Sequence, residues 1–188
     1  MRTNWKLIAG AGVLVVLLLV FYYSINNDLV RLHEGIDGAW AQVETVLQRR
    51  YDLVPNLVST VKGYAAHERE VLEEVTRARS QWAAAGSVGA KVEAAGALES
   101  ALARLMVVVE NYPDLKANQS FLALQDELAG TENRIAVERR RYNEAVQQYN
   151  TRVRSFPASL VARIAGFARS DAYFRADDTA REAPRVQF

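Results

Sequence analysis

The sequence predicts an all-α protein with an N-terminal single transmembrane helix followed by an antiparallel up-and-down four-helix bundle with long helices. Three observations predict it: an uncharged apolar run near the N-terminus, apolar residues three and four apart beyond it, and few glycines and prolines among 188 residues. The length suits one domain of ordinary size with an appendage. We therefore expect an anchor at 1–26, a helical bundle at 27–156, and a short amphipathic helix with an extended tail at 157–188.

The anchor is the apolar run LIAGAGVLVVLLLVFYY, which has no charge and ends in two tyrosines. At about 1.5 Å per residue it approaches the roughly 30 Å thickness of the hydrocarbon core. A cleaved signal peptide is the alternative, but the bulky FYYSINND that follows lacks the small residues of a cleavage site. The residues predicted to span the membrane are Leu7, Ile8, Val13, Leu14, Val15, Val16, Leu17, Leu18, Leu19, Val20, Phe21, Tyr22 and Tyr23.

Charges beside the anchor give its orientation. Arg2 and Lys6 precede it, whereas only Arg31 lies within the first twenty residues beyond it. The positive-inside rule therefore places the N-terminus in the cytoplasm and the bundle outside.

Two helices are expected next. The first, with an apolar stripe from Leu29 to Leu47, can run straight on from the anchor. Because Pro55 disrupts a helix interior but is tolerated in a first turn, we expect a break there and a second helix with Asp52 as its N-cap. This second helix carries apolar residues from Leu57 to Trp82 and ends before the glycines of AAAGSVGAK.

Two more helices complete the predicted bundle. The third spans Val92 to Val109 and ends before Pro113, which forces Tyr112 away from helical geometry. The fourth, capped by Asn118 or Ser120, has coiled-coil spacing. Its heptad row is Phe121, Leu128, Ile135, Tyr142 and Tyr149, and its second row is Leu124, Thr131, Glu138 and Ala145. Because Thr131 and Glu138 make this seam less apolar than that of a dedicated coiled coil, packing inside a bundle is the preferred interpretation.

Two questions stay open at this level. If Pro55 and Pro113 only kink the chain, residues 27–85 and 90–154 form two long helices that pair as a hairpin. The segment FPASLVARIAGFARSDAYF places Leu160, Val161, Ile164 and Phe167 on one side of a short helix. That helix either folds back on the bundle or lies on a membrane or a partner.

Composition and motifs exclude several functions. Without Arg2 and Lys6 the chain has 21 basic and 22 acidic residues, a balance of −1, so nucleic acid is not an expected partner. There is no cysteine, and the two histidines, His33 and His67, lack a metal-binding pattern. No phosphate-binding, dinucleotide-binding or nucleophile motif occurs. We expect neither an enzyme nor a cofactor.

Polar residues gather at the predicted breaks and on the fourth helix. They form either a hydrogen-bonded network that fixes helix register or a site for a ligand or partner. These candidates are Arg49, Arg50, Asp52, Asn56, Asn111, Asp114, Lys116, Glu132, Asn133, Arg134, Tyr142 and Asn143.

Long stretches of the chain resemble the LemA family. The resemblance rests on LQRRYDLVPNLVSTVKGYAAHE at 47–68, ENYPDLKANQSFLALQDELAGTENRIAVERRRYNEAVQQYN at 110–150, and an FP…GF pattern at Phe156, Pro157, Gly166 and Phe167. It implies a four-helix bundle behind one membrane helix in bacteria, without an established activity or cofactor. Family members are often associated with membranes and sometimes with membrane remodelling.

These observations favour a non-enzymatic scaffold in the bacterial cytoplasmic membrane. Its expected partners are the lipid bilayer, further copies of itself in a homo-oligomer, and another membrane protein. The alternative is an accessory or sensor subunit that binds a ligand through the polar candidates and modulates another membrane protein such as a protease.

Overall fold

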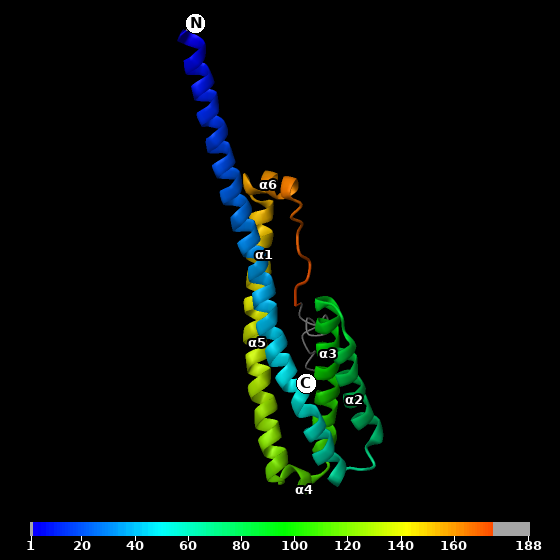
Figure 1. The fold of residues 1–188 in the computed structure, drawn as a ribbon. Helices are drawn as coiled ribbons and strands as arrows, with labels where there is room; N and C mark the ends of the chain where they lie inside the picture. Colours follow the sequence, from blue (N-terminus) through cyan, green and yellow to red (C-terminus); the bar gives the residue numbers. More distant parts are fainter. Residues whose placement is uncertain (1, 175–188) are drawn as a thin grey trace, which may run out of the picture. The chain divides into compact units, whose positions relative to one another are not determined.

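The computed structural model describes residues 2–174, with side chains from Trp5 onward. This part of the chain is helical and contains no strand, which confirms the predicted all-α class (Figure 1). The helices are α1 (Arg2–Tyr64), α2 (Arg69–Ala84), α3 (Val88–Val109), α4 (Pro113–Lys116), α5 (Gln119–Arg154) and α6 (Ala158–Ala165). The predicted tail beyond residue 174 lies outside the described residues.

Helix α1 is longer than predicted. The expectation that the first helix runs on from the anchor is confirmed, because α1 is unbroken from Arg2 to Tyr64. The predicted break at Pro55 and the predicted N-cap at Asp52 are wrong. Asp52 instead lies inside α1, where its carboxylate accepts a hydrogen bond from Gln48 one turn earlier (2.8 Å). The chain turns only after Tyr64.

Two features explain how α1 tolerates Pro55. Proline has no N–H, so the carbonyl of Tyr51 one turn earlier loses its helical donor. The side chain of Arg79, in α2, supplies the missing donor with an Nε to carbonyl oxygen distance of 3.2 Å. The apolar stripe also continues through the proline, because Tyr51, Val54 and Leu57 are all buried. Packing and one side-chain hydrogen bond thus offset the cost of an interior proline.

The contacts divide the chain into two compact units. The first contains Met1–Trp40 and Arg141–Asp171, and its core lies where α6 packs on α1. Ile25 and Leu29 of α1 are buried there against Ala158, Val161 and Ala162 of α6. Figure 1 shows α6 crosswise at the end of α5.

Polar contacts hold the rest of this first unit. Asp28 of α1 accepts a hydrogen bond from Arg152 of α5 (2.8 Å) and pairs with Arg31 on its own helix. The phenol of Tyr149 donates to the carbonyl of Ala168 (2.8 Å). Asn150 exchanges two hydrogen bonds with the backbone of Ser170 (2.7 and 2.9 Å). These contacts fix the chain that leaves α6 against α5.

The predicted apolar side of α6 is only partly correct. Val161 is buried and Phe167 is half-buried in the first unit, but Leu160 and Ile164 are exposed. The small residues Ala158 and Ala162 take their places against α1. The reason is size, because alanines allow an eight-residue helix to approach α1 closely while the larger side chains extend outward.

Gly166 ends α6 in the left-handed conformation that favours glycine, with φ of +81°. Its chain reversal lets the N–H of Phe167 donate to the carbonyl of Ala162 (2.9 Å). Phe167 then packs on the apolar cluster. This local geometry accounts for the GF pair of the sequence.

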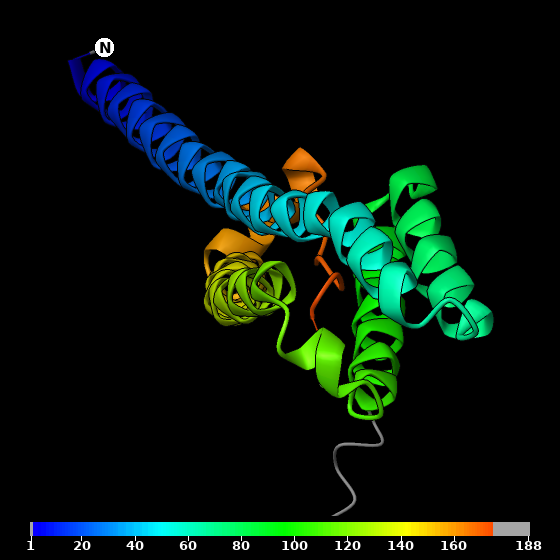
Figure 2. The same ribbon diagram turned by 90° about the horizontal axis from the view of Figure 1, so that it is seen from below.

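The second unit contains Ala41–Arg140 and Ala172–Phe188. Within it α2 and α3 pack as a helical hairpin (Figures 1 and 2). The predicted turn at the glycines is confirmed: Ala85 ends α2, and the Ser87 hydroxyl caps α3 by accepting from the N–H of Ala90 (3.2 Å).

The predicted break at Pro113 is also confirmed. Tyr112 has φ of −121° and ψ of 82°, and Pro113 opens the short helix α4. Asn118 then caps α5, since its side-chain oxygen accepts from the N–H of Phe121 (3.0 Å). All five residues of the predicted heptad row on α5 are buried.

The pairing of Asp28 predicts a pH dependence. Hydrogen bonds from Arg31 and then Arg152 lower the pKa of Asp28 against the opposing effect of burial. A depressed pKa stabilises the fold above the unfolded-state value, and this contribution is lost as pH falls through the folded-state value. Asp28→Asn should therefore lower the free energy of unfolding at pH 7 by under about 1 kcal/mol. The difference should shrink below about pH 4 and disappear once the pH is below the depressed folded-state pKa of Asp28.

Urea unfolding of the full chain in detergent, followed by circular dichroism between pH 7 and pH 3, measures this effect. Asp126→Asn, at an exposed position of α5, is the matched control and should change stability little. A loss for Asp28→Asn that stays constant across the pH range would contradict the ion-pair explanation.

The proline contact predicts a non-additive pair of substitutions. Arg79→Ala leaves the Tyr51 carbonyl without a donor and should cost about 1–2 kcal/mol. Pro55→Ala restores a backbone N–H at that carbonyl and should stabilise α1 by about 1–3 kcal/mol. In the Pro55→Ala background Arg79→Ala should cost almost nothing. Unfolding of the parent, both single variants and the double variant checks this, and equal costs of Arg79→Ala in both backgrounds would rule it out.

Candidate functional site

The main candidate for a functional surface is the exposed apolar surface of α1. From Trp5 to Phe21 every large apolar side chain is at least half exposed. An 18-residue window of this helix has a mean hydropathy of 2.4 with only 6% of the window buried. Within the described residues α1 is the one helix long and apolar enough to cross a membrane, by length and composition. A continuous apolar surface of this size is typical of a segment that contacts lipid or protein.

The predicted polar candidates lie in several separate places. Arg49, Arg50 and Glu132 lie in the second unit, where α1 and α5 are joined by two ion pairs. Arg49 pairs with Glu127 at the surface, and Arg50 pairs with Glu132. Asp52 and Asn56 are exposed on α1, and Asn133 and Arg134 are exposed on α5.

The remaining candidates are elsewhere. Asn111 and Asp114 are exposed near the start of α4, and Lys116 pairs with Glu110 (2.5 Å). Tyr142 and Asn143 belong to the first unit. Tyr142 is buried there with its ring 5.7 Å from that of Trp40, and burial raises the pKa of its phenol.

Arg50 is the most enclosed charge among the candidates. Its side chain is 12% exposed, compared with 55% for Arg49. Burial lowers the pKa of Arg50, and the carboxylate of Glu99 acts in the opposite direction. Arg139 of α5 contacts the same Glu99 at 3.4 Å and lies over the ring of Phe174 (5.2 Å). These contacts join α1, α3 and α5 around one group of charges.

An aromatic pair lies next to this group. The rings of Tyr51 and Trp82 stack 4.0 Å apart, and the Lys91 ammonium lies 5.4 Å from the Trp82 ring. Lys91 also pairs with Glu44 of α1. Burial raises the pKa of Tyr51 well above its usual range, so its phenol stays neutral. The arrangement packs α2 and α3 on α1 and presents no ionised nucleophile.

Sequence reasoning missed the partners that complete these contacts. Glu99 and Arg139 were not among the candidates, and neither was Tyr51. The available signal was spacing, because Tyr51 lies four residues after Leu47 and three before Val54, which continues the stripe of the first helix.

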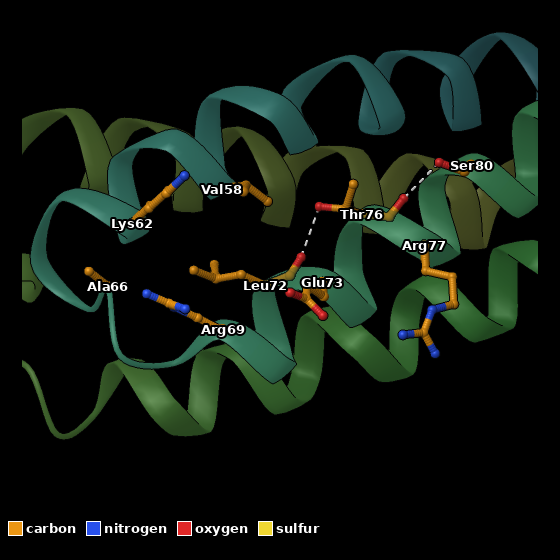
Figure 3. Close-up of a pocket in the computed structure, with 9 residues that line it drawn as sticks. All are labelled: Val58, Lys62, Ala66, Arg69, Leu72, Glu73, Thr76, Arg77 and Ser80. Atoms are coloured by element: carbon orange, nitrogen blue, oxygen red, sulfur yellow. Dashed lines mark hydrogen bonds between the residues drawn. The ribbon is translucent and has the colours of Figure 1, made fainter.

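A groove of about 620 Å³ lies beside α2 and the end of α1 (Figure 3). The groove is lined by the basic side chains of Lys62, Arg69 and Arg77 together with the acidic Glu73. None of the predicted polar candidates is among the residues that line it. Its hydroxyl groups are engaged locally, since Thr76 and Ser80 each donate to a carbonyl one turn earlier on α2 (2.8 and 3.0 Å). The groove thus has a mixed-charge wall without a buried polar group directed into it.

The described residues contain no group of three or more histidine, aspartate or glutamate side chains arranged to hold a metal ion. Several charged side chains among the described residues instead form ion pairs between helices, such as Arg49 with Glu127 and Arg139 with Glu99.

The enclosure of Arg50 predicts unequal costs for its ion pair and the neighbouring one. Glu132→Ala leaves the Arg50 guanidinium without its carboxylate in a place that water reaches poorly, and should cost about 2 kcal/mol. Glu127→Ala removes the partner of the exposed Arg49 on the same helix and should cost less than about 1 kcal/mol. Urea unfolding of the two variants is the measurement, and equal costs would contradict the burial argument.

Comparison with known proteins identifies the family to which the chain belongs. Residues 39–188 match the family model described as the LemA family. Magnetosome proteins MamQ 2 and MamQ 1 of Paramagnetospirillum magneticum are each 29% identical over 189 residues, covering 85% of this chain and 69% of the relative. Protein LemA of Metamycoplasma hominis is 27% identical over 143 residues, covering 76% of this chain and 65% of the relative. The family match covers well over half of the chain, which therefore belongs to the LemA family.

Proposed function

We propose that this protein is a non-enzymatic scaffold of a bacterial cytoplasmic membrane, anchored by α1 and self-associating through its helices. The observation that carries the proposal is the exposed apolar surface of α1 between Trp5 and Tyr23. Water contacts such a surface at a cost of about 25 cal/mol per Å² of apolar area, whereas a bilayer removes that cost.

The membrane orientation follows the flanking charges. Arg2 and Lys6 precede the apolar run, so the N-terminus lies in the cytoplasm and the helices after Tyr23 lie outside. Tyr22 and Tyr23 then occupy the outer interface, where aromatic rings are favoured.

The helices beyond the anchor form the antiparallel four-helix bundle in this proposal. Its support is a set of ion pairs between helices: Glu44 of α1 with Lys91 of α3, Glu74 of α2 with Arg104 of α3, and Arg139 of α5 with Glu99 of α3. Each pair restricts which helix faces meet. A bundle of this kind offers long, rigid and mixed-charge faces to other proteins.

Self-association is the second part of the proposal. Confinement to a membrane raises the effective concentration of neighbouring chains, so weak contacts between bundles suffice. Two relatives are named as magnetosome proteins, and a role within a cellular structure is the setting in which a scaffold acts. Polar helix faces, such as those of α5, supply contacts between chains that do not need to stay permanently buried.

Energy transfer between labelled chains in liposomes tests self-association. The chain has no cysteine, so Val107→Cys on an exposed part of α3 gives one labelling site for donor and acceptor populations. Dilution with lipid should leave transfer well above the level for randomly placed chains. Pairing the donor with a labelled unrelated single-pass protein is the control, and transfer that falls to the control level would contradict self-association.

A further inference from the structure

The outward side of α6 carries apolar side chains that the first unit leaves uncovered. Phe156, Leu160 and Ile164 are 80%, 54% and 74% exposed. Leu160 and Ile164 are four residues apart and so share one face of the helix, and Phe156 lies in the turn just before α6 begins. The opposite face is already used, because Ala158, Val161 and Ala162 are buried against α1. α6 is thus apolar on two sides and packed on only one.

The position of α6 along α1 identifies what covers the second side. The cluster that holds α6 contains Ile25 and Leu29, with Tyr22 packed at its edge. At 1.5 Å per residue, Ile25 and Leu29 lie about 3 and 9 Å beyond Tyr23 along the helix. The headgroup region of a bilayer extends roughly 5–8 Å beyond the hydrocarbon core on each side. The cluster that holds α6 therefore spans the headgroup level, with Leu29 at its outer edge.

The direction and charge of α6 fit the same location. Figure 1 shows α6 crosswise to the helices α1 and α5 at this end of the first unit. A helix in this direction lies along the surface of a membrane that α1 crosses. Arg154 and Arg163 are exposed near the apolar side chains and suit phosphate headgroups.

We infer that α6 is a second membrane contact, an interfacial helix whose Phe156, Leu160 and Ile164 insert into the bilayer surface. This inference rests on the proposed anchoring of α1. It adds a lipid-binding surface from a segment more than 130 residues away in the sequence, and it fixes how the first unit meets the membrane. A single spanning helix leaves rotation and tilt free, whereas a spanning helix with an attached interfacial helix restricts both.

Site-specific labelling of the full chain in lipid nanodiscs tests the inference. The chain has no cysteine, so Leu160→Cys and Ile164→Cys each give one site for an environment-sensitive fluorophore. Discs of phosphatidylcholine with phosphatidylglycerol, loaded with one chain each, expose both membrane faces to the water-soluble reductant dithionite. Labels at 160 and 164 should react at least about tenfold more slowly than a label at Gln148→Cys, an exposed position of α5.

One further label and the number of chains per disc separate the possible failures. A label at Leu18→Cys reports on the anchor itself. If that label is protected while labels at 160 and 164 react as fast as the one at 148, the α6 inference is overturned and the anchor stands. If the label at 18 also reacts fast, both proposals fail. Protection at 160 that appears only in discs holding two chains would assign the surface to a second copy and overturn the lipid contact.

A substitution series shows whether the apolar side chains cause the protection. With the label at Phe156→Cys, the double change Leu160→Ser and Ile164→Ser should raise the dithionite rate to that of the label at 148. Ser159→Ala, on the same helix, is the control and should leave the rate unchanged. An unchanged far-ultraviolet spectrum verifies folding, and full protection in the double variant would overturn the inference.

Discussion

The rest of the structure depends on the continuity of helix α1. One helix of 63 residues carries the exposed apolar segment at its start and buried core residues from Ile25 to Val61 further along. The large apolar side chains of its first part, from Trp5 to Phe21, are at least half exposed. Because α1 is continuous, no break separates the candidate spanning segment from the core residues that follow it on the same helix.

The continuous helix contains a proline, Pro55, and the break predicted from the sequence at this residue is wrong. Proline removes a helical hydrogen bond, so a break at Pro55 was the better prediction from local propensity alone. Two tertiary effects override it: the buried stripe at Tyr51, Val54 and Leu57, and the hydrogen bond from Arg79 to the Tyr51 carbonyl. The stripe was readable in the sequence. The contribution of Arg79 was not, because it comes from a different helix.

The other breaks were predictable because their causes are local. Ser87 and Asn118 cap the helices that follow them, and Pro113 opens a helix as expected. The candidate polar residues were predictable only in part. Spacing places Arg50 on a helix, but its burial and its Glu132 partner depend on how α1 and α5 pack. The two apolar sides of α6 could not be predicted from the sequence either. Alanines face α1 while Leu160 and Ile164 stay exposed, whereas hydrophobicity alone favours burial of the larger side chains.

The insertion of α1 into a bilayer is tested most directly by a spin-label scan from Trp5 to Leu32 in nanodiscs. Single cysteines along this stretch report the accessibility of each position to oxygen, which concentrates in lipid, and to a nickel chelate, which stays in water. The account predicts high oxygen access at every position of Leu7–Tyr23, followed by a helical periodicity with low access to both reagents at Ile25 and Leu29. Chelate access throughout Leu7–Tyr23, or loss of helical periodicity after Tyr23, would contradict it.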